Sequence, residues 1–391
     1  MTARDVAIVG VGTTRFGKHI DRSLKSLGAE AIDCALSDAG IAATEIDMAF
    51  VANSMASIIT GQVAVVGQTI LRAHGFSGIP VFNVDNACAG SSSALSLAVQ
   101  AIRSGSASVV LVLGVEKLMS ADRTRAYVAL NGAADTDFVA ESGIDPTRES
   151  VFVAAVYPSR LADYATRYGL EAKTLAEIAV KNRRHASKNA LAQFTDPISV
   201  EDVLGARSIV GPITALMCAP ITDGASAIVL ARPDRVTKSQ RPVWILGSAV
   251  GMGTPPDAGS SIRSVATQAY GQAGLQPADI DVAEVHDSVS FNELLAYEQL
   301  GFCAPGEGSR LVADGATALG GKLPVNMSGG LESRGHPVAA TGAAQIAELT
   351  IQLRGEAGER QVVGARHALA ENAGGFAGDD TAAIAVTILG G

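Results

Sequence analysis

The sequence predicts an α/β protein with two related halves, and three observations lead to this fold class. Short apolar runs rich in Val, Ile and Gly alternate with amphipathic helical patterns, which is typical of strand–helix–strand units around a parallel sheet. Three short motifs recur in the same order in both parts of the chain. The 391 residues also exceed what one hydrophobic core usually holds, so two packed units are expected.

Five apolar runs are expected to form strands, and four amphipathic stretches are expected to form helices that cover them. The expected strands are Val6–Val11, Val109–Gly114, Ser226–Leu230, Val243–Gly247 and Ala382–Ile388. The expected helices are Ser26–Ala39, Ser92–Arg103, Arg263–Ala273 and Thr341–Arg354.

The recurring motifs predict a duplicated domain. The matched pairs are DVAIVG at 5–10 with VWILG at 243–247, AGI and EIDMA within 39–49 with AGL and DIDVA within 273–283, and DGASAI at 223–228 with DTAAI at 380–384. A repeat of this length implies two halves, at 1–240 and 241–391. The first half is longer, and its excess falls between Lys117 and Cys218, where polar helices interrupt the strand pattern. We therefore expect an inserted loop domain at about 118–218 that lies over the core and contacts ligands.

Composition excludes several classes of function. The net charge of −9 and the pI near 5.2 disfavour a nucleic-acid-binding role. No apolar run reaches the ~18–20 residues of a membrane span, and neither a secretion signal nor a peroxisomal address is recognised. The four cysteines form no CxxC pair or zinc spacing, so no metal site is predicted. We expect a cytoplasmic protein with free thiols.

The motif DNACAGSSS at 85–93 is the first candidate site. It lies between an extended segment and an amphipathic helix, so Cys88 is expected at a helix start, where backbone N–H groups and the helix dipole stabilise a thiolate. The thiolate is the nucleophilic form, and neighbouring N–H groups can stabilise an oxyanion. The alternative is a buried structural cysteine in a tight turn.

Two histidine motifs in the second half are candidates for acid–base groups. His336 lies in GHP at 335–337, before a helix, at the position that corresponds to Cys88 in the repeat. If the halves are related by pseudo-symmetry, the two helix starts share one cavity, and a neutral imidazole can activate the thiol. His286, in EVHDSVSF at 284–291, is expected at the end of a strand, where it can donate to a substrate oxyanion. Loop and surface histidines are the alternatives.

Two further segments are candidates for ligand contacts. The glycines of ENAGGFAG at 371–378 allow close backbone approach for an oxyanion hole, although an ordinary turn before the last strand is the alternative. The basic residues Lys181, Arg183 and Arg184 suit a phosphate of a nucleotide, although a solvated helix face is the alternative. Ser328, in the glycine-rich NMSGG at 326–330, is assigned to the same ligand.

Taken together, the motifs resemble those of the thiolase superfamily, and most closely its sterol-carrier-protein-x branch of lipid-transfer proteins and acetyl-CoA acetyltransferases. The resemblance runs from Val6 to Leu389 and includes NACAGS at 86–91, APITDGA at 219–225, HDS at 286–288, GHP at 335–337 and NAGG at 372–375. It implies a duplicated thiolase fold in five αβαβα layers with an inserted loop domain. It also implies a homodimer or tetramer, and a coenzyme A thioester as the substrate, with no covalently bound cofactor.

The resemblance also implies roles for individual residues. Cys88 accepts the acyl group, His336 activates it and donates to an oxyanion, and His286 belongs to the first oxyanion hole. The N–H groups of Cys88 and Gly374 form the second hole. Ordinary thiolases shuttle a proton with a second cysteine, where this chain has Asn372, and the sterol-carrier branch uses a cysteine where this chain has Ser288.

Three functions follow as hypotheses. The first is an acyl-CoA acyltransferase that forms an acyl-Cys88 intermediate and passes the acyl group to a carbon nucleophile or to CoA. The second is retro-aldol cleavage with a small zinc-ribbon/OB-fold partner, although relatives of that kind do not depend on a nucleophilic cysteine. The third is a degenerate thiolase that binds acyl-CoA for lipid transfer or as a scaffold.

Overall fold

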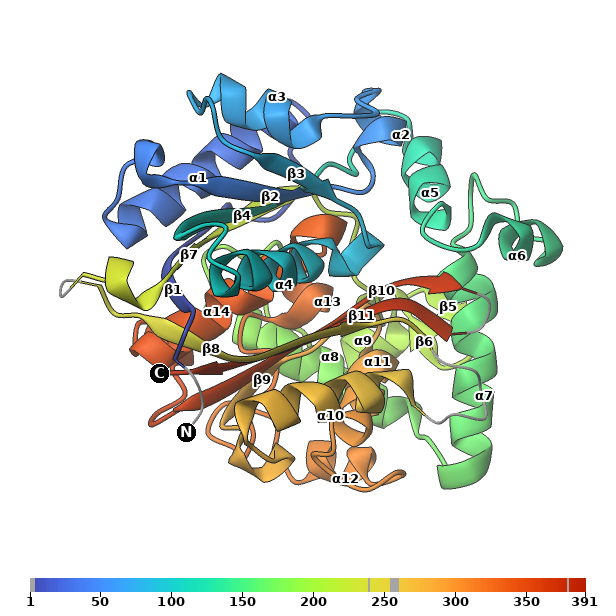
Figure 1. The fold of residues 1–391 in the computed structure, drawn as a ribbon. Coiled ribbons are helices and arrows are strands. Elements are labelled where there is room, and N and C mark those ends of the chain that lie inside the picture. The colour runs from blue at the N-terminus through green and yellow to red at the C-terminus, as the bar shows by residue number, and fades with distance from the viewer. Residues whose placement is uncertain (1–3, 238–239, 254–259, 378–379) are drawn as a thin grey trace.

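The computed structural model describes residues 4–237, 240–253, 260–377 and 380–391, and most of its strands form one large mixed sheet (Figure 1). The nine strands of this sheet lie in the order β3-β2-β4-β7-β1-β8-β11-β10-β9, and β5 pairs with β6 separately. The strands are β1 Ala7–Thr13, β2 Met48–Ala52, β3 Val81–Val84, β4 Val109–Glu116, β5 Ser208–Val210, β6 Ile213–Thr214, β7 Gly224–Ala231, β8 Val243–Gly251, β9 Val282–Glu284, β10 His367–Ala377 and β11 Asp380–Gly390.

The helices form three layers that alternate with the two parts of the sheet (Figure 1). They are α1 Leu24–Ala39, α2 Ala56–Thr60, α3 Val66–Ala73, α4 Gly90–Arg103, α5 Arg123–Asn131, α6 Thr136–Glu141, α7 Tyr157–Tyr168, α8 Ala172–Ala186, α9 Val200–Gly205, α10 Ser261–Ala273, α11 Ser290–Gln299, α12 Gly308–Ala313, α13 Gly330–Arg334 and α14 Thr341–Arg354. Helices α1 and α3 cover one outer face, α10 and α11 cover the other, and α4 and α14 lie between the two parts. The predicted α/β fold in αβαβα layers is confirmed.

The two outer layers repeat the same local design. Helix α1 begins at a Ser23 cap and ends at Gly40 (φ 65°), while α10 begins at a Ser260 cap and ends at Gly274 (φ 66°). Gly10 of β1 and Gly247 of β8 let the covering helix pack closely, since a Cβ there would lie 2.2 and 2.4 Å from helix carbonyl oxygens. The sequence repeat thus corresponds to matching structural units, while the domain limits at 240 and 241 stay predictions.

The sheet is mixed, whereas the sequence pattern predicted a parallel sheet. Strand β2 is parallel to β3 and β4, and β9 is parallel to β10, but β7 is antiparallel to both of its neighbours, as are β8 and β11. A buried apolar run has the same pattern in either direction, so its sequence does not encode strand polarity. The segment around Gly374 is also no turn, because it lies within the long strand β10; Gly378 lies outside the described residues.

The segment between β4 and β7 stands apart from the central sheet. It contains α5–α9 and the β5-β6 hairpin, and its buried residues form a cluster with Val289, Phe291 and Leu294 of the second half. None of the helices in the described ranges combines the length and apolar character needed to cross a bilayer.

Candidate active site

Cys88 lies in a short, tightly turned segment between β3 and α4. The turn is a 3-10 helix over Ala87–Ala89, and Ala87 has a positive φ of 47°, which a side chain rarely adopts. Asp85 holds this turn by accepting the Ala87 N–H at 3.0 Å, and Asn86 donates to Ser93 Oγ at 2.8 Å. The thiol is thereby presented at the start of α4 and is partly exposed to a cavity.

This cavity has a volume of about 820 Å³ and lies between the segment at 118–218 and the second half of the chain. Its floor carries Cys88, His286 and His336, and most of its wall is apolar. The apolar wall includes Met55, Leu130, Phe152, Val153, Ile209, Val210, Leu216, Ile221, Val289, Leu295, Val338 and Phe376. Such a lining suits an acyl chain.

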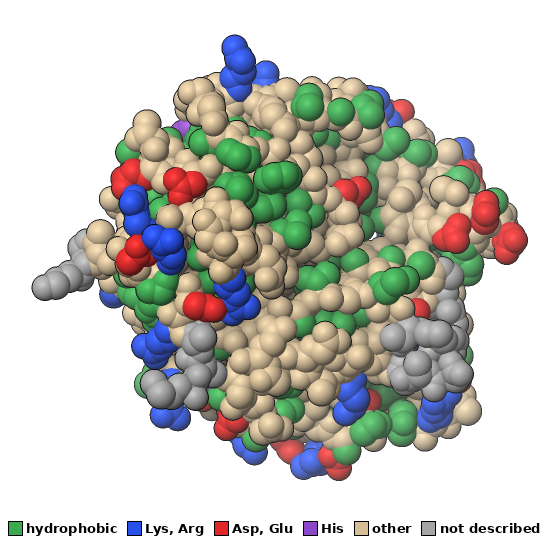
Figure 2. Space-filling model, viewed as in Figure 1, with side chains coloured by type: hydrophobic (Ala, Val, Ile, Leu, Met, Phe, Trp, Pro, Cys, Tyr) green, Lys and Arg blue, Asp and Glu red, His purple; other side chains and the backbone are tan. Residues whose placement is uncertain are grey.

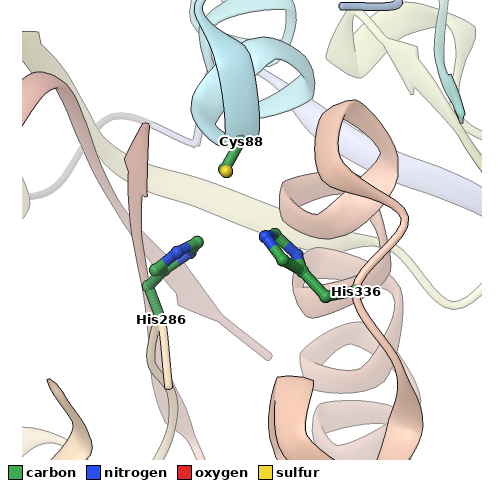
Figure 3. Close-up of side chains that lie close together, drawn as sticks. All are labelled: Cys88, His286 and His336. Atoms are coloured by element: carbon green, nitrogen blue, oxygen red, sulfur yellow. The ribbon is translucent and has the colours of Figure 1, made fainter. Parts of the chain in front are cut away.

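The structure brings Cys88, His286 and His336 together from three separate segments (Figure 3). The Cys88 sulfur and one ring nitrogen from each histidine lie within 4.8 Å of one another. The two imidazoles meet edge to face, with ring centroids 5.2 Å apart and an interplanar angle of 83°. The sulfur points toward the space between the rings, so a reacting carbonyl there could contact all three groups.

His336 is held by the loop between α13 and α14. Its backbone N–H donates to Thr222 Oγ1 at 3.1 Å, and its Nδ1 lies 2.7 Å from Thr341 Oγ1. Burial, His286 and Arg334 together hold the pKa of His336 well below its usual range. The imidazole is therefore neutral at physiological pH, as a base for a thiol must be.

His286 follows β9 and is oriented by Asn372 of β10. Asn372 Nδ2 donates to His286 Nδ1 at 3.1 Å, while its Oδ1 accepts from Ser92 Oγ at 2.9 Å. Burial, with Arg334 nearby, lowers the pKa of His286 to about 3, so the ring is neutral. A neutral ring that accepts at Nδ1 carries its proton on Nε2, which suits an oxyanion better than a metal ion. Sequence reasoning missed this role of Asn372.

Burial favours the neutral thiol of Cys88, in contrast to the expectation that the helix start stabilises the thiolate. Burial raises the pKa of Cys88 to about 12, the buried Glu116 adds to the shift, and the N–H of Gly375 opposes it. Burial outweighs the local N–H groups because a charged sulfur loses its hydration. A neutral thiol becomes nucleophilic when a base takes its proton, and the two imidazoles are bases within reach of it.

Alkylation kinetics test this protonation state. The rate of reaction of Cys88 with iodoacetamide is expected to rise about tenfold per pH unit between pH 7 and 9 without levelling off, because the thiolate fraction grows toward the raised pKa. A cysteine peptide, whose pKa is near 8.5, is the control and should begin to level off. A rate that is constant from pH 5 to 8 would instead indicate a thiolate–imidazolium pair.

Gly374 lets β10 pass directly beneath the turn at Ala87–Ala89. A Cβ at this position would lie 2.3 Å from the Asn86 carbonyl oxygen and 2.6 Å from the Ala89 nitrogen, so no side chain fits. The N–H that donates toward the Cys88 sulfur belongs to the next residue, Gly375. The predicted donor role of Gly374 itself stays a prediction.

Ser288 lies on the cavity wall and belongs to a hydroxyl pair that the sequence did not reveal. Its Oγ is 2.7 Å from the hydroxyl of Tyr157, and Asn292 Nδ2 donates to Ser288 at 2.9 Å. Tyr157 begins α7, more than a hundred residues away in the sequence, and no motif marked it.

The structure gives other partners to the basic residues predicted to bind CoA. Lys181 is buried and paired with Glu293, Arg183 is buried and donates to Ser333, and the buried Ser328 is bonded to Glu284. None of these three lines the cavity, and Arg184 is exposed outside it. Helix α8 turns Lys181 and Arg183 toward the protein interior, and Ser328 lies buried just before α13, so the cavity lining gives no support to their predicted role as ligand contacts. The exposed Arg207, by contrast, lines the cavity.

Comparison with known proteins gives the family. The family described as "Thiolase, N-terminal domain" matches residues 6–210, and "Thiolase C-terminal domain-like" matches residues 255–387. The chain is 38% identical to the acetyl-CoA acetyltransferase of Methanothermobacter thermautotrophicus, over 97% of this chain and 98% of the relative. It is 38% identical to human sterol carrier protein 2, over 95% of this chain and 70% of the relative.

Two further similarities extend the comparison. The benzoylsuccinyl-CoA thiolase subunit BbsB of Thauera aromatica is 36% identical, over 92% of this chain and 91% of the relative. Among solved structures, the chain is similar to one titled "Ltp2-ChsH2(DUF35) aldolase", with a TM-score of 0.80 and 27% identity over 100% of this chain and 98% of the other. The matched domains span both halves, and the chain therefore belongs to the thiolase family.

Proposed function

We propose that this protein is an acyl-CoA acyltransferase that carries its acyl group on Cys88. The observation that supports this proposal is the convergence of one thiol and two neutral imidazoles on the floor of an apolar cavity. Relatives named acetyl-CoA acetyltransferase and thiolase subunit support the same class of reaction.

In the proposed first step, the Cys88 sulfur attacks the thioester carbonyl while His336 Nε2 takes the thiol proton. His336 can do so if Nδ1–H donates to Thr341, which leaves a lone pair on Nε2. The Nε2–H of His286 donates to the oxyanion, and backbone N–H groups of the catalytic turn complete the hole. When the tetrahedral intermediate collapses, the C–S bond to CoA breaks, and His336 returns the proton to the departing thiolate.

In the proposed second step, a carbon nucleophile or a CoA thiol attacks acyl-Cys88 and releases it. The volume of about 820 Å³ supports an acyl group larger than acetyl, because its apolar wall gains about 0.8 kcal/mol per buried CH₂. Arg207 is a candidate contact for a CoA phosphate, since it is an exposed cation on the cavity wall.

Intact-mass spectrometry tests the acyl-enzyme directly. Incubation with acetyl-, butyryl- and octanoyl-CoA should add the matching acyl mass, and peptide mapping should locate it on Cys88. Cys88→Ala should show no adduct, because Cys88 is the thiol that lies beside the two imidazoles. Wild-type protein that stays unmodified with all three thioesters would overturn the proposal.

Retro-aldol cleavage with a small partner protein is the second candidate, and the likeness to the aldolase structure favours it. The two candidates differ in their dependence on Cys88. Cleavage that survives Cys88→Ala would support the aldolase, and loss of activity would support acyl transfer. Binding of acyl-CoA without adduct or cleavage would instead support the lipid-transfer or scaffold function.

We further propose a homodimer that forms through β3. This strand lies at the edge of the sheet, and its Phe82 is 48% exposed, with Leu97 of α4 at 46%. Hydrophobic side chains gather over this region, while acidic and basic ones lie around the rim (Figure 2). An open edge strand with an apolar side chain suits pairing with a second copy. A cytoplasmic location stays a prediction.

Light scattering after size exclusion tests the dimer. The wild type should elute with twice the mass of one chain, and Phe82→Glu should shift it to the monomer, because a carboxylate would be buried in the interface. Val363→Glu is the control, since Val363 is 93% exposed on another segment. A monomeric wild type, or a dimer unaffected by Phe82→Glu, would contradict this interface.

A further inference from the structure

The hydroxyls of Tyr157 and Ser288 form a polar spot on the cavity wall, beside Asn292 and near Arg160, which lies over the Phe376 ring at 4.8 Å. The two oxygens are 2.7 Å apart, and Asn292 Nδ2 lies 2.9 Å from Ser288 Oγ and 3.3 Å from the Tyr157 oxygen. Tyr157 is 5% exposed, and its ring packs edge to face on that of Phe376, with the ring centroids 6.4 Å apart. All of these residues line the cavity that holds Cys88.

Counting hydrogens shows what this pair offers to a ligand. Each hydroxyl carries one proton, and only one of the two protons is used in the bond between Tyr157 and Ser288. Asn292 donates to both oxygens and therefore takes neither proton. One O–H remains for an acceptor in the cavity. Burial, together with the nearby Cys88, raises the pKa of Tyr157, so the pair stays protonated and acts as a donor.

Two chain segments connect the hydroxyl pair with the residues around Cys88, so the pair lies close to the carbon that would react there. Ser288 is two residues beyond His286, which limits their Cα separation to about 7 Å. Phe376, which packs on Tyr157, directly follows Gly375, whose N–H donates toward the Cys88 sulfur. An acyl chain that starts at Cys88 and runs along this wall would pass the hydroxyl pair within its first few carbons.

We propose that Tyr157 and Ser288 together select acyl groups that carry a hydroxyl within a few carbons of the thioester. This inference rests on the proposed acyl transfer to Cys88. The free O–H donates to the substrate oxygen, and Asn292 holds both hydroxyls in place. An unsubstituted acyl chain leaves this O–H without an acceptor, which weakens binding of the transition state.

Single-turnover acylation of Cys88 by a matched pair of thioesters tests the inference. For wild-type protein, 3-hydroxybutyryl-CoA is expected to acylate Cys88 about 10–100 times more efficiently than butyryl-CoA. Tyr157→Phe and Ser288→Ala each leave one hydroxyl, so the ratio should fall only in part. The double variant has no hydroxyl at this spot, and its ratio should be near one.

Tyr164→Phe is the matched control. Tyr164 lies on the same helix α7 and donates to Glu298 at 2.6 Å, but it does not line the cavity. This variant should keep the wild-type ratio. A wild-type ratio near one, or a double variant that keeps the wild-type ratio, would overturn the inference. If neither thioester acylates the wild type, the proposed function itself fails, so the two failures are distinguishable.

Discussion

Replacing Cys88 with serine is expected to lower acyl-transfer turnover by about 10⁴-fold or more. The thiol already depends on proton transfer, because its pKa is raised to about 12 and the pKa of His336 lies well below the usual range. A serine hydroxyl is a far weaker acid than a thiol, so the same weakly basic imidazole cannot activate it. Steady-state kinetics with butyryl-CoA and a CoA or carbon acceptor measure the loss.

Cys34→Ser is the control for this substitution. Cys34 is an exposed free thiol on α1 that does not line the cavity, and the same chemical change there should alter turnover less than twofold. Thermal unfolding of both variants shows whether the fold is preserved. Turnover above about one per cent of wild type in Cys88→Ser would contradict the role of this thiol as the nucleophile.

Asn372→Asp is expected to lower turnover at pH 8 by about 10²–10³-fold, because it reverses the proton position on His286. An aspartate accepts where the asparagine donates, so His286 would carry its proton on Nδ1 and present a lone pair to the oxyanion. The size of the effect follows from the loss of one oxyanion donor in a buried site. A second readout is the ¹⁵N shift of the His286 ring, which reports the tautomer directly.

The pH dependence of turnover distinguishes the change in His286 tautomer from a general loss of structure at the site. A neighbouring carboxylate raises the pKa of an imidazole, so His286 in Asn372→Asp would become doubly protonated as the pH falls. Its Nε2–H would then return, and turnover should increase from pH 8 to pH 6. In the wild type the pKa of His286 is about 3, so the ring stays neutral between pH 8 and pH 6 and turnover should not increase over this range. Asn372→Ala, which lacks the carboxylate, should lose activity without recovery at low pH.

The buried strands and helices could be predicted from the sequence because their signals are local. The expected helix Thr341–Arg354 coincides with α14, and each expected strand overlaps an observed one. The membership in the thiolase family was also predictable, since ordered motifs such as NACAGS and GHP are specific together. The direction of each strand could not be predicted, because a buried apolar run has the same sequence pattern in parallel and antiparallel strands.

The basic cluster at 181–185 shows where sequence reasoning fails. Three cations close together suggest a phosphate site, yet Lys181 is only 8% exposed and paired with Glu293, a residue of the other half of the chain. Charge is visible in the sequence, but the partner that neutralises it comes from the tertiary fold. The same reason hid Tyr157 and Asn372, whose partners lie more than eighty residues away.

The sequence by itself determined that this chain has repeated α/β halves and that Cys88, His286 and His336 are its candidate reactive groups, because these properties depend on residue type and local spacing. The tertiary structure decided the protonation of the thiol, the tautomer of His286 and the hydroxyl pair on the cavity wall. Each of these depends on burial and on hydrogen-bond partners, which exist only once distant segments have packed together.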